Sequence, residues 1–436
     1  MTTQPRAGDR ASGSDSPATK PCPKPDDAPA SSPADWAPGD KRQIALLSVA
    51  HAVQHFYTAA FAFSYPFVVD EFHISYATLG LVLGITGVAG GLLQGVAGLV
   101  RKASARRLLV GQDVGLAASL VLAAAAPVFV VFAIARCLGA FIQWPQHPVG
   151  SAYLSERVPH RRSLALSWHT IGGSIGTLAV PLIAGGVIAV WGWRWSLVVF
   201  VPGLLLGAAL LWHGMEEHAT PAPEAAGRTE QAVTAAPLRA VLRRPTVMAV
   251  LAAGTVAAAG RGLGVLSTYV PAFLHDGRHL SSVTTGALFT VVLVGSVGGP
   301  VMAGWLADRV GRRAVLLAVY PAGAVCLGAY VFVGSSVWVL AGVGLLVGAF
   351  AYAESPLLQS LYADATSGGD SRSLFGIFFA VAYGVGALWQ VLVGWLVTAH
   401  GFQVAFLVMA VSFVAAGALI VGVRGDKRGL GDAHAA

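Results

Sequence analysis

Histidines at helical spacing are the most chemically distinctive feature of this chain. His51 and His55 are four residues apart and therefore lie on one face of a helix. Imidazole changes its charge near neutral pH and bonds polar ligands. We expect these residues to contact a solute or protons on a polar, aromatic cavity wall, or else to hydrogen-bond neighbouring helices. The other residues predicted for this wall are Tyr57, Gln143, His147 and His169, with Trp389 and Gln390 on the opposite wall.

A histidine pair four residues apart also suits a metal ion. In the sequence, however, no acid or cysteine near the pair completes a ligand set. Cys22, Cys137 and Cys326 are far apart and have no metal-ligand spacing. The sequence therefore predicts no metal site, no disulfide framework and no cofactor.

Two arginines and a glutamate lie deep inside long apolar segments. A charge at membrane depth costs roughly 2.5–3.5 kcal/mol on insertion scales, so it needs water or a partner. Arg136 and Arg261 either face a central cavity and attract an anionic group, or form buried ion pairs and bonds to helix carbonyls. Glu354 is the candidate for proton coupling, because an isolated carboxyl in a low dielectric readily takes up a proton; the alternative is a permanent pair with Arg261. Asp113 is expected to pair with loop arginines.

Long apolar segments are the elements that position these residues. Each has about 20 residues, enough to cross ~30 Å of hydrocarbon as a helix. Apolar residues make up 55% of the chain and charged residues only 11%, against about 25% charged in soluble domains. Twelve segments are predicted, at 44–68, 76–99, 107–126, 128–153, 164–190, 195–213, 246–273, 283–306, 314–333, 336–362, 373–398 and 402–423.

The basic residues gather on one side of these segments. If successive loops alternate between the two sides, all but four of the 28 Lys and Arg residues lie on the same side. Arg194 and Arg278 lie in loops on the other side, and Arg136 and Arg261 lie within segments. Because basic loops stay in the cytoplasm, both termini are expected there, in a multi-pass protein of the inner or plasma membrane. The net charge of +7 then faces anionic lipid, and no nucleic-acid partner is indicated.

The chain divides into two similar halves. We predict a disordered tail at 1–40, a six-helix bundle at 41–214, a polar linker at 215–245, a second six-helix bundle at 246–424 and a tail at 425–436. Gly139-Ala140-Phe141 recurs as Gly348-Ala349-Phe350. A duplicated unit suits a transporter, because two similar bundles can rock about a site between them. The expected fold class is an all-α membrane protein with 12 transmembrane helices in two pseudo-symmetric bundles.

One loop of the second half carries a specific motif. Residues 304–313 read GWLADRVGRR, with an acid that pairs locally, a glycine that turns the chain and arginines that hold the cytoplasmic face. The residues of this predicted gating motif are Asp308, Arg309, Gly311, Arg312 and Arg313. The segment closely resembles the loop signature of the major facilitator superfamily, and the resemblance covers about 44–423. It implies that Asp308 holds one gating state, whereas the first half has Lys102 and Ala105 where the acid and the glycine should be.

The resemblance implies a secondary active transporter and not an enzyme. The first segment and the fourth and fifth segments are most similar to fosmidomycin-resistance-type exporters, and the glycines of 164–190 resemble an antiporter motif. We therefore expect a monomer that exports a small anionic or polar solute by proton antiport with alternating access. Proton-coupled import of a carboxylate is the alternative, which the sequence does not separate. The sequence contains no phosphate-binding glycine loop, so ATP hydrolysis is not expected. A large soluble domain would support a membrane receptor instead, and we find none in the sequence.

Overall fold

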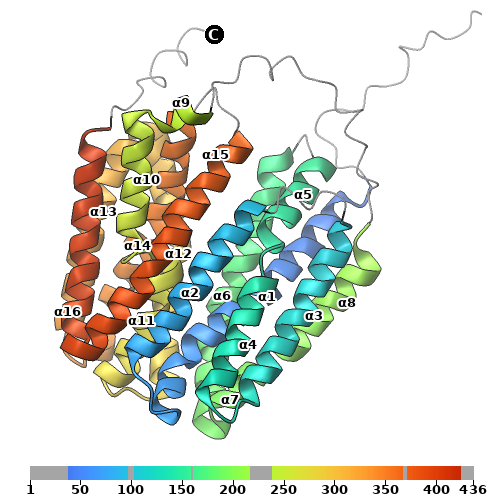
Figure 1. Cartoon of the computed structure of the whole chain (residues 1–436), viewed down its shortest axis with the longest axis vertical. Coiled ribbons are helices and arrows are strands. Elements are labelled where there is room, and N and C mark those ends of the chain that lie inside the picture. The colour runs from blue at the N-terminus through green and yellow to red at the C-terminus, as the bar shows by residue number, and fades with distance from the viewer. Residues whose placement is uncertain (1–37, 97–102, 159–160, 217–237, 367–370, 424–436) are drawn as a thin grey trace, which may run out of the picture. The chain divides into compact units, whose positions relative to one another are not determined.

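The computed structural model describes residues 38–96, 103–158, 161–216, 238–366 and 371–423, and the regular structure in these ranges is helical (Figure 1). Ten of the described helical segments are long and apolar enough to cross a membrane. The predicted all-α membrane fold is therefore confirmed. Most of the predicted tails and linker, together with 97–102 of the first-half loop, lies outside the described residues.

The helices of the first half follow the predicted segments closely. Their bounds are α1 (Asp40–Glu71), α2 (Tyr76–Val96), α3 (Ala105–Ala124), α4 (Phe129–Ile142), η2 (Gln146–Gly150), α5 (Ser151–Arg157), α6 (Arg162–Trp191), α7 (Trp193–Val198) and α8 (Val201–Gly214). Ser104 caps α3 by accepting a hydrogen bond from the amide of Arg107. The predicted segment at 195–213 is divided between α7 and α8, just before Pro202.

The second half contains more interruptions. Its elements are α9 (Leu238–Leu242), α10 (Pro245–Ala257), η5 (Gly262–Leu266), α11 (Ser267–Ala272), η6 (Phe273–Gly277), α12 (Ser282–Val310), α13 (Arg312–Phe332), α14 (Val337–Ala365), α15 (Ser371–Phe378), η7 (Phe379–Gly384), η8 (Val385–Ala387) and α16 (Leu388–Val421). Gly401 has a φ of 80° and divides α16 in two, close to the predicted boundary between 398 and 402. The broken segment from α10 to η6 stands where one span is predicted, so the number of twelve crossings stays a prediction.

Wide π-helical turns interrupt several of these spans. The elements η2, η5, η6 and η7 are all of this kind. In η2 the cause lies in the sequence, since Pro145 and Pro148 each lack the amide hydrogen that a regular helix needs. Such turns often lie at functional sites, and three of the four carry or contact residues predicted to bind the solute.

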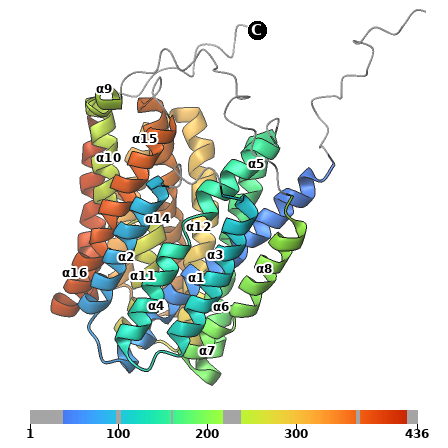
Figure 2. The same cartoon turned by 45° about the vertical axis from the view of Figure 1, so that its right-hand side comes forward.

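Close helix packing connects the elements of each half and the two halves to each other. Within the halves α1 packs on α6, and α12 packs on α14. The halves meet where α2 runs beside α16 and where α6 runs beside α12 (Figures 1 and 2). Glycines permit this approach: a β-carbon on Gly176 would lie 2.1 Å from the carbonyl oxygen of Ala52, and one on Gly348 would lie 1.8 Å from that of Val292.

Candidate functional site

Four histidines of the first half meet between α1, η2 and α6. The Nε2 atoms of His51 and His55 are 3.1 Å apart, as their spacing along α1 predicts. The ring of His169 stacks on His51 with 4.2 Å between centroids. The ring of His147 stands edge-on to both, at 5.1 Å from His51 and 6.3 Å from His55. His51 is buried, His55 is partly buried and His147 is exposed.

Hydrogen bonds to α1 and α6 hold three of these rings in place. The Nδ1 atom of His51 lies 2.7 Å from the carbonyl oxygen of His169, and that of His55 lies 2.6 Å from Oγ1 of Thr177. His169 in turn bonds the carbonyl oxygen of Leu47 through its own Nδ1, at 3.2 Å. The predicted bonding between helices is therefore present, and the structure adds that all four histidines belong to one cluster.

Arg136 lies among aromatic rings on the opposite side of α1. Its Nε donates to the hydroxyl of Tyr65 at 2.9 Å, and its guanidinium carbon lies 5.6 Å from the ring centroid of Tyr57 and 5.5 Å from that of Phe61. One guanidinium nitrogen, Nη1, is buried and has no hydrogen bond to any residue that the structure describes. Within the described residues no carboxylate pairs with this cation, so it keeps unused capacity for an anionic group.

Arg261 and Glu354 form a buried ion pair with two hydrogen bonds. The distances are 2.9 Å from Nε to Oε2 and 3.2 Å from Nη2 to Oε1, and the side chains are 3% and 0% exposed. The guanidinium also donates to the carbonyl oxygens of Gly254 and Ala382, at 2.6 and 2.9 Å. Tyr320 donates to Oε1 at 3.4 Å. Of the two alternatives open from the sequence, this conformation has the ion pair; the expectations of an isolated Glu354 and a cavity-facing Arg261 are not met in it.

The break in the seventh predicted span explains this arrangement. The helix α10 ends at Ala257, and the carbonyls of its last turn, including that of Gly254, have no amide partner within the helix. Arg261 follows in an extended conformation, with φ −64° and ψ 135°, and its guanidinium satisfies that carbonyl. The ring of Tyr383 from η7 lies under the guanidinium, 4.5 Å from its carbon. The cation is therefore held by groups that regular helices would not offer.

The remaining polar residues of the predicted walls bond neighbouring helices. Gln143 accepts a hydrogen bond from Thr58 at 3.3 Å. Trp389 donates to the carbonyl oxygen of Thr255 at 2.9 Å. Gln390 is 7% exposed and donates to the hydroxyl of Thr268, but its own Oε1 is buried without a partner in the described ranges. Tyr57 is fully buried, and its hydroxyl donates to the carbonyl oxygen of Arg136, so it helps to fix the position of the arginine backbone.

Asp113 differs from its predicted surroundings. The carboxyl is fully buried. Its Oδ1 accepts a hydrogen bond from the side-chain amide of Gln112 at 3.2 Å and not from a loop arginine of the described residues. Its Oδ2 is buried, accepts no hydrogen bond from the residues that the structure describes, and faces Gly207 of α8. The expected pairing with loop arginines is therefore wrong for the described residues, where Arg106 instead contacts Trp212 of α8. A carboxylate in an apolar segment indicates a residue that needs a partner, but spacing along the sequence does not identify that partner.

Comparison with known proteins decides the family. The sequence profile of the Major Facilitator Superfamily matches residues 47–389 and 262–433. The chain belongs to this superfamily. The uncharacterized MFS-type transporter YfnC of Bacillus subtilis (strain 168) is 24% identical over 376 residues, which cover 84% of this chain and 89% of that protein.

Solved structures agree with the superfamily fold. A crystal structure of a variant of the nucleoside transporter NupG matches with a TM-score of 0.71 and 14% identity, over 87% of this chain and 99% of that one. A bacterial homologue of the human lysosomal transporter Spinster matches with a TM-score of 0.68 and 15% identity, over 88% and 97%. The major facilitator protein described here is thus a multi-pass membrane transporter of the MFS type.

The predicted gating motif occupies the turn between α12 and α13. Gly311 has a φ of 91°, which suits glycine and turns the chain. Arg313 donates to the carbonyl oxygens of Ile420 and Val421, Arg312 pairs with Asp364, and Arg309 lies over the ring of Trp305. Asp308 is exposed and has no ion-pair partner among the described residues. The arginines thus bind ends of second-half helices, and the gating role of Asp308 stays a prediction.

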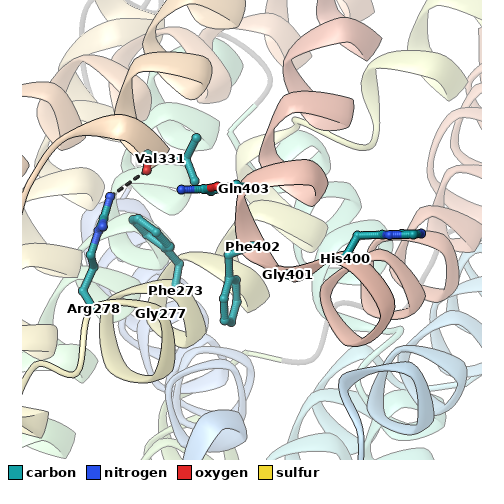
Figure 3. Close-up of a pocket in the computed structure, with 8 residues that line it drawn as sticks. All are labelled: Phe273, Gly277, Arg278, Val331, His400, Gly401, Phe402 and Gln403. Carbon is teal, nitrogen blue, oxygen red and sulfur yellow. Dashed lines mark hydrogen bonds between the residues drawn. The ribbon is translucent and has the colours of Figure 1, made fainter.

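A surface pocket lies elsewhere, at the ends of the helices. It is lined by residues on both sides of Gly401 together with Phe273, Gly277, Arg278 and Val331 (Figure 3). Arg278 donates to the carbonyl oxygens of Val331 and Val333, at 2.6 and 2.5 Å. None of the residues predicted to bind the solute lines this pocket, so it does not serve as the predicted substrate site.

Proposed function

We propose that this protein is a proton-coupled secondary transporter that exports a small organic, anionic or polar solute by antiport. The guanidinium of Arg136 carries the proposal. It lies within a predicted span, and no carboxylate pairs with it in the part of the chain that the structure describes. A cation at membrane depth costs roughly 2.5–3.5 kcal/mol, and an anionic group of the solute would offset that cost. Tyr57, Phe61 and Tyr65 surround it and would contact the organic part of the solute.

Two buried carboxyls support the proton coupling. Glu354 neutralises Arg261 in this conformation. Protonation of Glu354 would remove one charge of the pair and leave Arg261 to the carbonyls and to the solute. Asp113 is a second buried acid, and no cation pairs with it among the described residues. Exchange of a proton against the solute at either carboxyl would couple the two fluxes.

Contacts between the halves support alternating access. Hydrogen bonds join them near the ends of the helices that are predicted to face outward, from Tyr76 to Asp276, from the amide of Ala77 to Thr398, and from Ser282 to the carbonyl oxygen of Gly185. At the opposite ends Asp308 of the gating motif is exposed. We infer that this conformation is closed toward the outside, with both termini in the cytoplasm.

The direction of transport rests on resemblance. The glycines of α6 resemble an antiporter motif, and the first, fourth and fifth spans resemble fosmidomycin-resistance-type exporters. The similar structures are of a nucleoside transporter and a homologue of a lysosomal transporter, so they do not choose one class of solute. The inner or plasma membrane is the proposed location, and a monomer is the proposed unit.

The test begins with a thermal-shift screen of carboxylates, organic phosphates and nucleosides on the purified protein. The compound that stabilises it most is then measured in proteoliposomes with an imposed pH gradient. We expect Arg136→Met to raise KM about ten- to hundredfold, from the loss of a charged hydrogen bond of ~1.5–3 kcal/mol. Arg239→Gln, at an exposed position of α9, is the matched control and should transport normally. Normal transport by Arg136→Met would refute the anion site.

The proton role has a separate readout. Transport by the parent protein should follow the pH gradient. Asp113→Asn, or Glu354→Gln with its rate divided by the amount of folded protein that remains in the liposomes, should transport without responding to the gradient. The variant that loses the response identifies the coupling carboxyl. Transport by the parent protein that ignores the gradient would remove proton coupling from the proposal, and inward accumulation driven by protons would favour the importer.

A further inference from the structure

The histidine cluster has more nitrogen atoms than the protein can satisfy. Neither ring nitrogen of His147 has a hydrogen-bond partner among the described residues. The Nε2 atom of His169 is buried and has none. The Nε2 atoms of His51 and His55 face each other at 3.1 Å. Several imidazole nitrogens that converge on one place, some of them without a protein partner, are the donor set of a borderline transition-metal ion.

The geometry of the His51–His55 pair fits such an ion. Two imidazole nitrogens bound to one tetrahedral Zn²⁺ at 2.0–2.1 Å lie about 3.3 Å apart, close to the 3.1 Å observed. His147 supplies a third nitrogen, and the three ligand atoms lie within 4.8 Å of one another. Its ring therefore has to move by at most about 1.5 Å, and His147 is exposed and free to turn.

The surroundings also orient the two inner ligands correctly. A histidine that binds a metal almost always donates its other ring N–H to an oxygen. His51 does so from Nδ1 to the carbonyl oxygen of His169, and His55 can do so from Nδ1 to Thr177. Thr177 accepts this hydrogen because its own hydroxyl donates to the carbonyl oxygen of Gly173 at 3.0 Å. In this arrangement neither Nε2 atom carries a hydrogen, so two lone pairs lie 3.1 Å apart. A cation bound to both, beside the line that joins them, would remove their repulsion.

We propose that His51, His55 and His147 bind a divalent transition-metal ion of the Zn²⁺ type. Imidazole selects such ions over Mg²⁺ and Ca²⁺, which prefer oxygen ligands. Three histidines leave the fourth tetrahedral position for water. The ion would join α1 to η2. The ring of His169, which stacks on His51, would hold that ligand in place. The sequence predicted that His147 shares a cavity wall with the pair, but it predicted no metal site, because spacing along the chain does not show that His147 comes within ligand distance of His51 and His55.

The competing arrangement has no metal. If Thr177 donates instead to Nδ1 of His55, then His55 donates from Nε2 to His51, and the hydrogen bonds continue to His169 without a cation. That chain satisfies His51 and His55 but leaves His147 unused. The two arrangements differ in whether Zn²⁺ binds and in whether His147 contributes.

Cobalt binding to the purified full chain tests the proposal. The protein carries no histidine tag and is treated with a chelator, and Co²⁺ is added because its visible absorption reports tetrahedral nitrogen coordination. We expect one ion per chain, displacement by Zn²⁺ and no displacement by Mg²⁺. His55→Gln and His147→Gln should each weaken binding at least tenfold, while His213→Gln, an exposed histidine of α8, should bind as the parent does. Saturating Zn²⁺ should raise the unfolding temperature of the parent and not of His55→Gln.

A second variant tests the orientation without removing a ligand. Thr177→Val should weaken Co²⁺ binding about 10–100-fold, whereas Thr170→Val, an exposed position of the same helix, should not. Absence of stoichiometric binding, or unchanged binding in His147→Gln, would overturn the metal site and favour the metal-free series of hydrogen bonds. These measurements need no transport, so they can fail or succeed independently of the proposed anion site at Arg136.

Discussion

Tyr76 at the start of α2 donates a hydrogen bond to Asp276 of η6, with 2.5 Å between the hydroxyl oxygen and Oδ2. The other carboxylate oxygen of Asp276 lies 2.5 Å from Nδ1 of His275. Close by, the amide of Ala77 donates to Thr398 at 3.0 Å. Tyr76 and Ala77 belong to the first half and the other three residues to the second, so these bonds tie the halves together at one end of the helices.

Tyr76→Phe should weaken this connection while leaving the packing intact. A hydrogen bond to a charged acceptor contributes about 1.5–3 kcal/mol, so the population with separated outer ends should rise about tenfold or more. Spin labels at Thr78 and Gln403, both exposed, would report the distance between the halves by double electron–electron resonance, in a background without native cysteines.

Tyr330→Phe is the matched control for that experiment. The hydroxyl of Tyr330 is buried in the second half and has no hydrogen-bond partner among the described residues, so its removal should leave the distance distribution unchanged. If Tyr76→Phe gave the same distribution as the parent, the bond to Asp276 would not hold the halves together.

Glu354→Gln should destabilise the protein strongly. The substitution keeps the volume of the side chain but leaves Arg261 as an uncompensated buried charge, which costs about 3–5 kcal/mol. The unfolding temperature in detergent should fall accordingly. Glu156→Gln, at an exposed position of α5, should change it little.

Replacing both Arg261 and Glu354 distinguishes the contribution of the ion pair from the cost of leaving one charge unpaired. A double variant, Arg261→Met with Glu354→Leu, removes both buried charges and should recover much of the stability lost in Glu354→Gln. An unfolding temperature of Glu354→Gln equal to that of the parent would show that the carboxylate is not needed to neutralise Arg261.

Gly176→Ala should separate α1 from α6. The added β-carbon would lie 2.1 Å from the carbonyl oxygen of Ala52, and backbone cannot move aside cheaply. Overpacking of this kind costs about 1–3 kcal/mol, so the unfolding temperature should fall. Gly186→Ala in the same helix meets nothing within 4 Å and should be neutral or stabilising, because alanine favours a helix by roughly 0.5–1 kcal/mol. A similar effect of both substitutions would argue against the close contact.

Tyr65→Phe should weaken solute binding without removing Arg136. The hydroxyl of Tyr65 accepts from Nε of Arg136 at 2.9 Å and orients the guanidinium. Loss of about 1 kcal/mol of hydrogen bonding should raise KM for an anionic solute severalfold and leave kcat unchanged. Tyr330→Phe again serves as the control. An unchanged KM would mean that the orientation of Arg136 does not affect binding.

Local properties of the chain were predictable because they depend on neighbours in sequence. The apolar segment at 314–333 became α13 from Arg312 to Phe332, since its length matches the membrane and hydrogen bonds within a helix need no distant partner. The repeated glycines of the two halves also have a shared role. A β-carbon on Gly139 would lie 1.8 Å from the hydroxyl oxygen of Tyr57, just as one on Gly348 would meet Val292.

Pairing between distant residues was less predictable. The expected partners of Asp113 were wrong, because a carboxylate in an apolar segment can meet any of several helices and spacing does not say which. For Glu354 the sequence left two alternatives, and the break beside Arg261 led to the ion pair in this conformation. The π-helical turns at η2 and η7 changed the direction of side chains in ways that a regular helical period does not predict.

The sequence by itself determined that this protein lies in a membrane, that it is helical and that it resembles the major facilitator superfamily. These properties follow from the length and composition of its apolar segments and from one loop motif. It also placed His51 beside His55, since four residues make one helical turn. Only the tertiary structure decided that His147 and His169 join that pair and that Glu354 neutralises Arg261. It also decided that Arg136 has no carboxylate partner among the described residues and keeps one nitrogen, Nη1, without a hydrogen bond there. The reason is physical: these contacts depend on which helices lie side by side, and that is set by glycine contacts and helix breaks far apart in the chain.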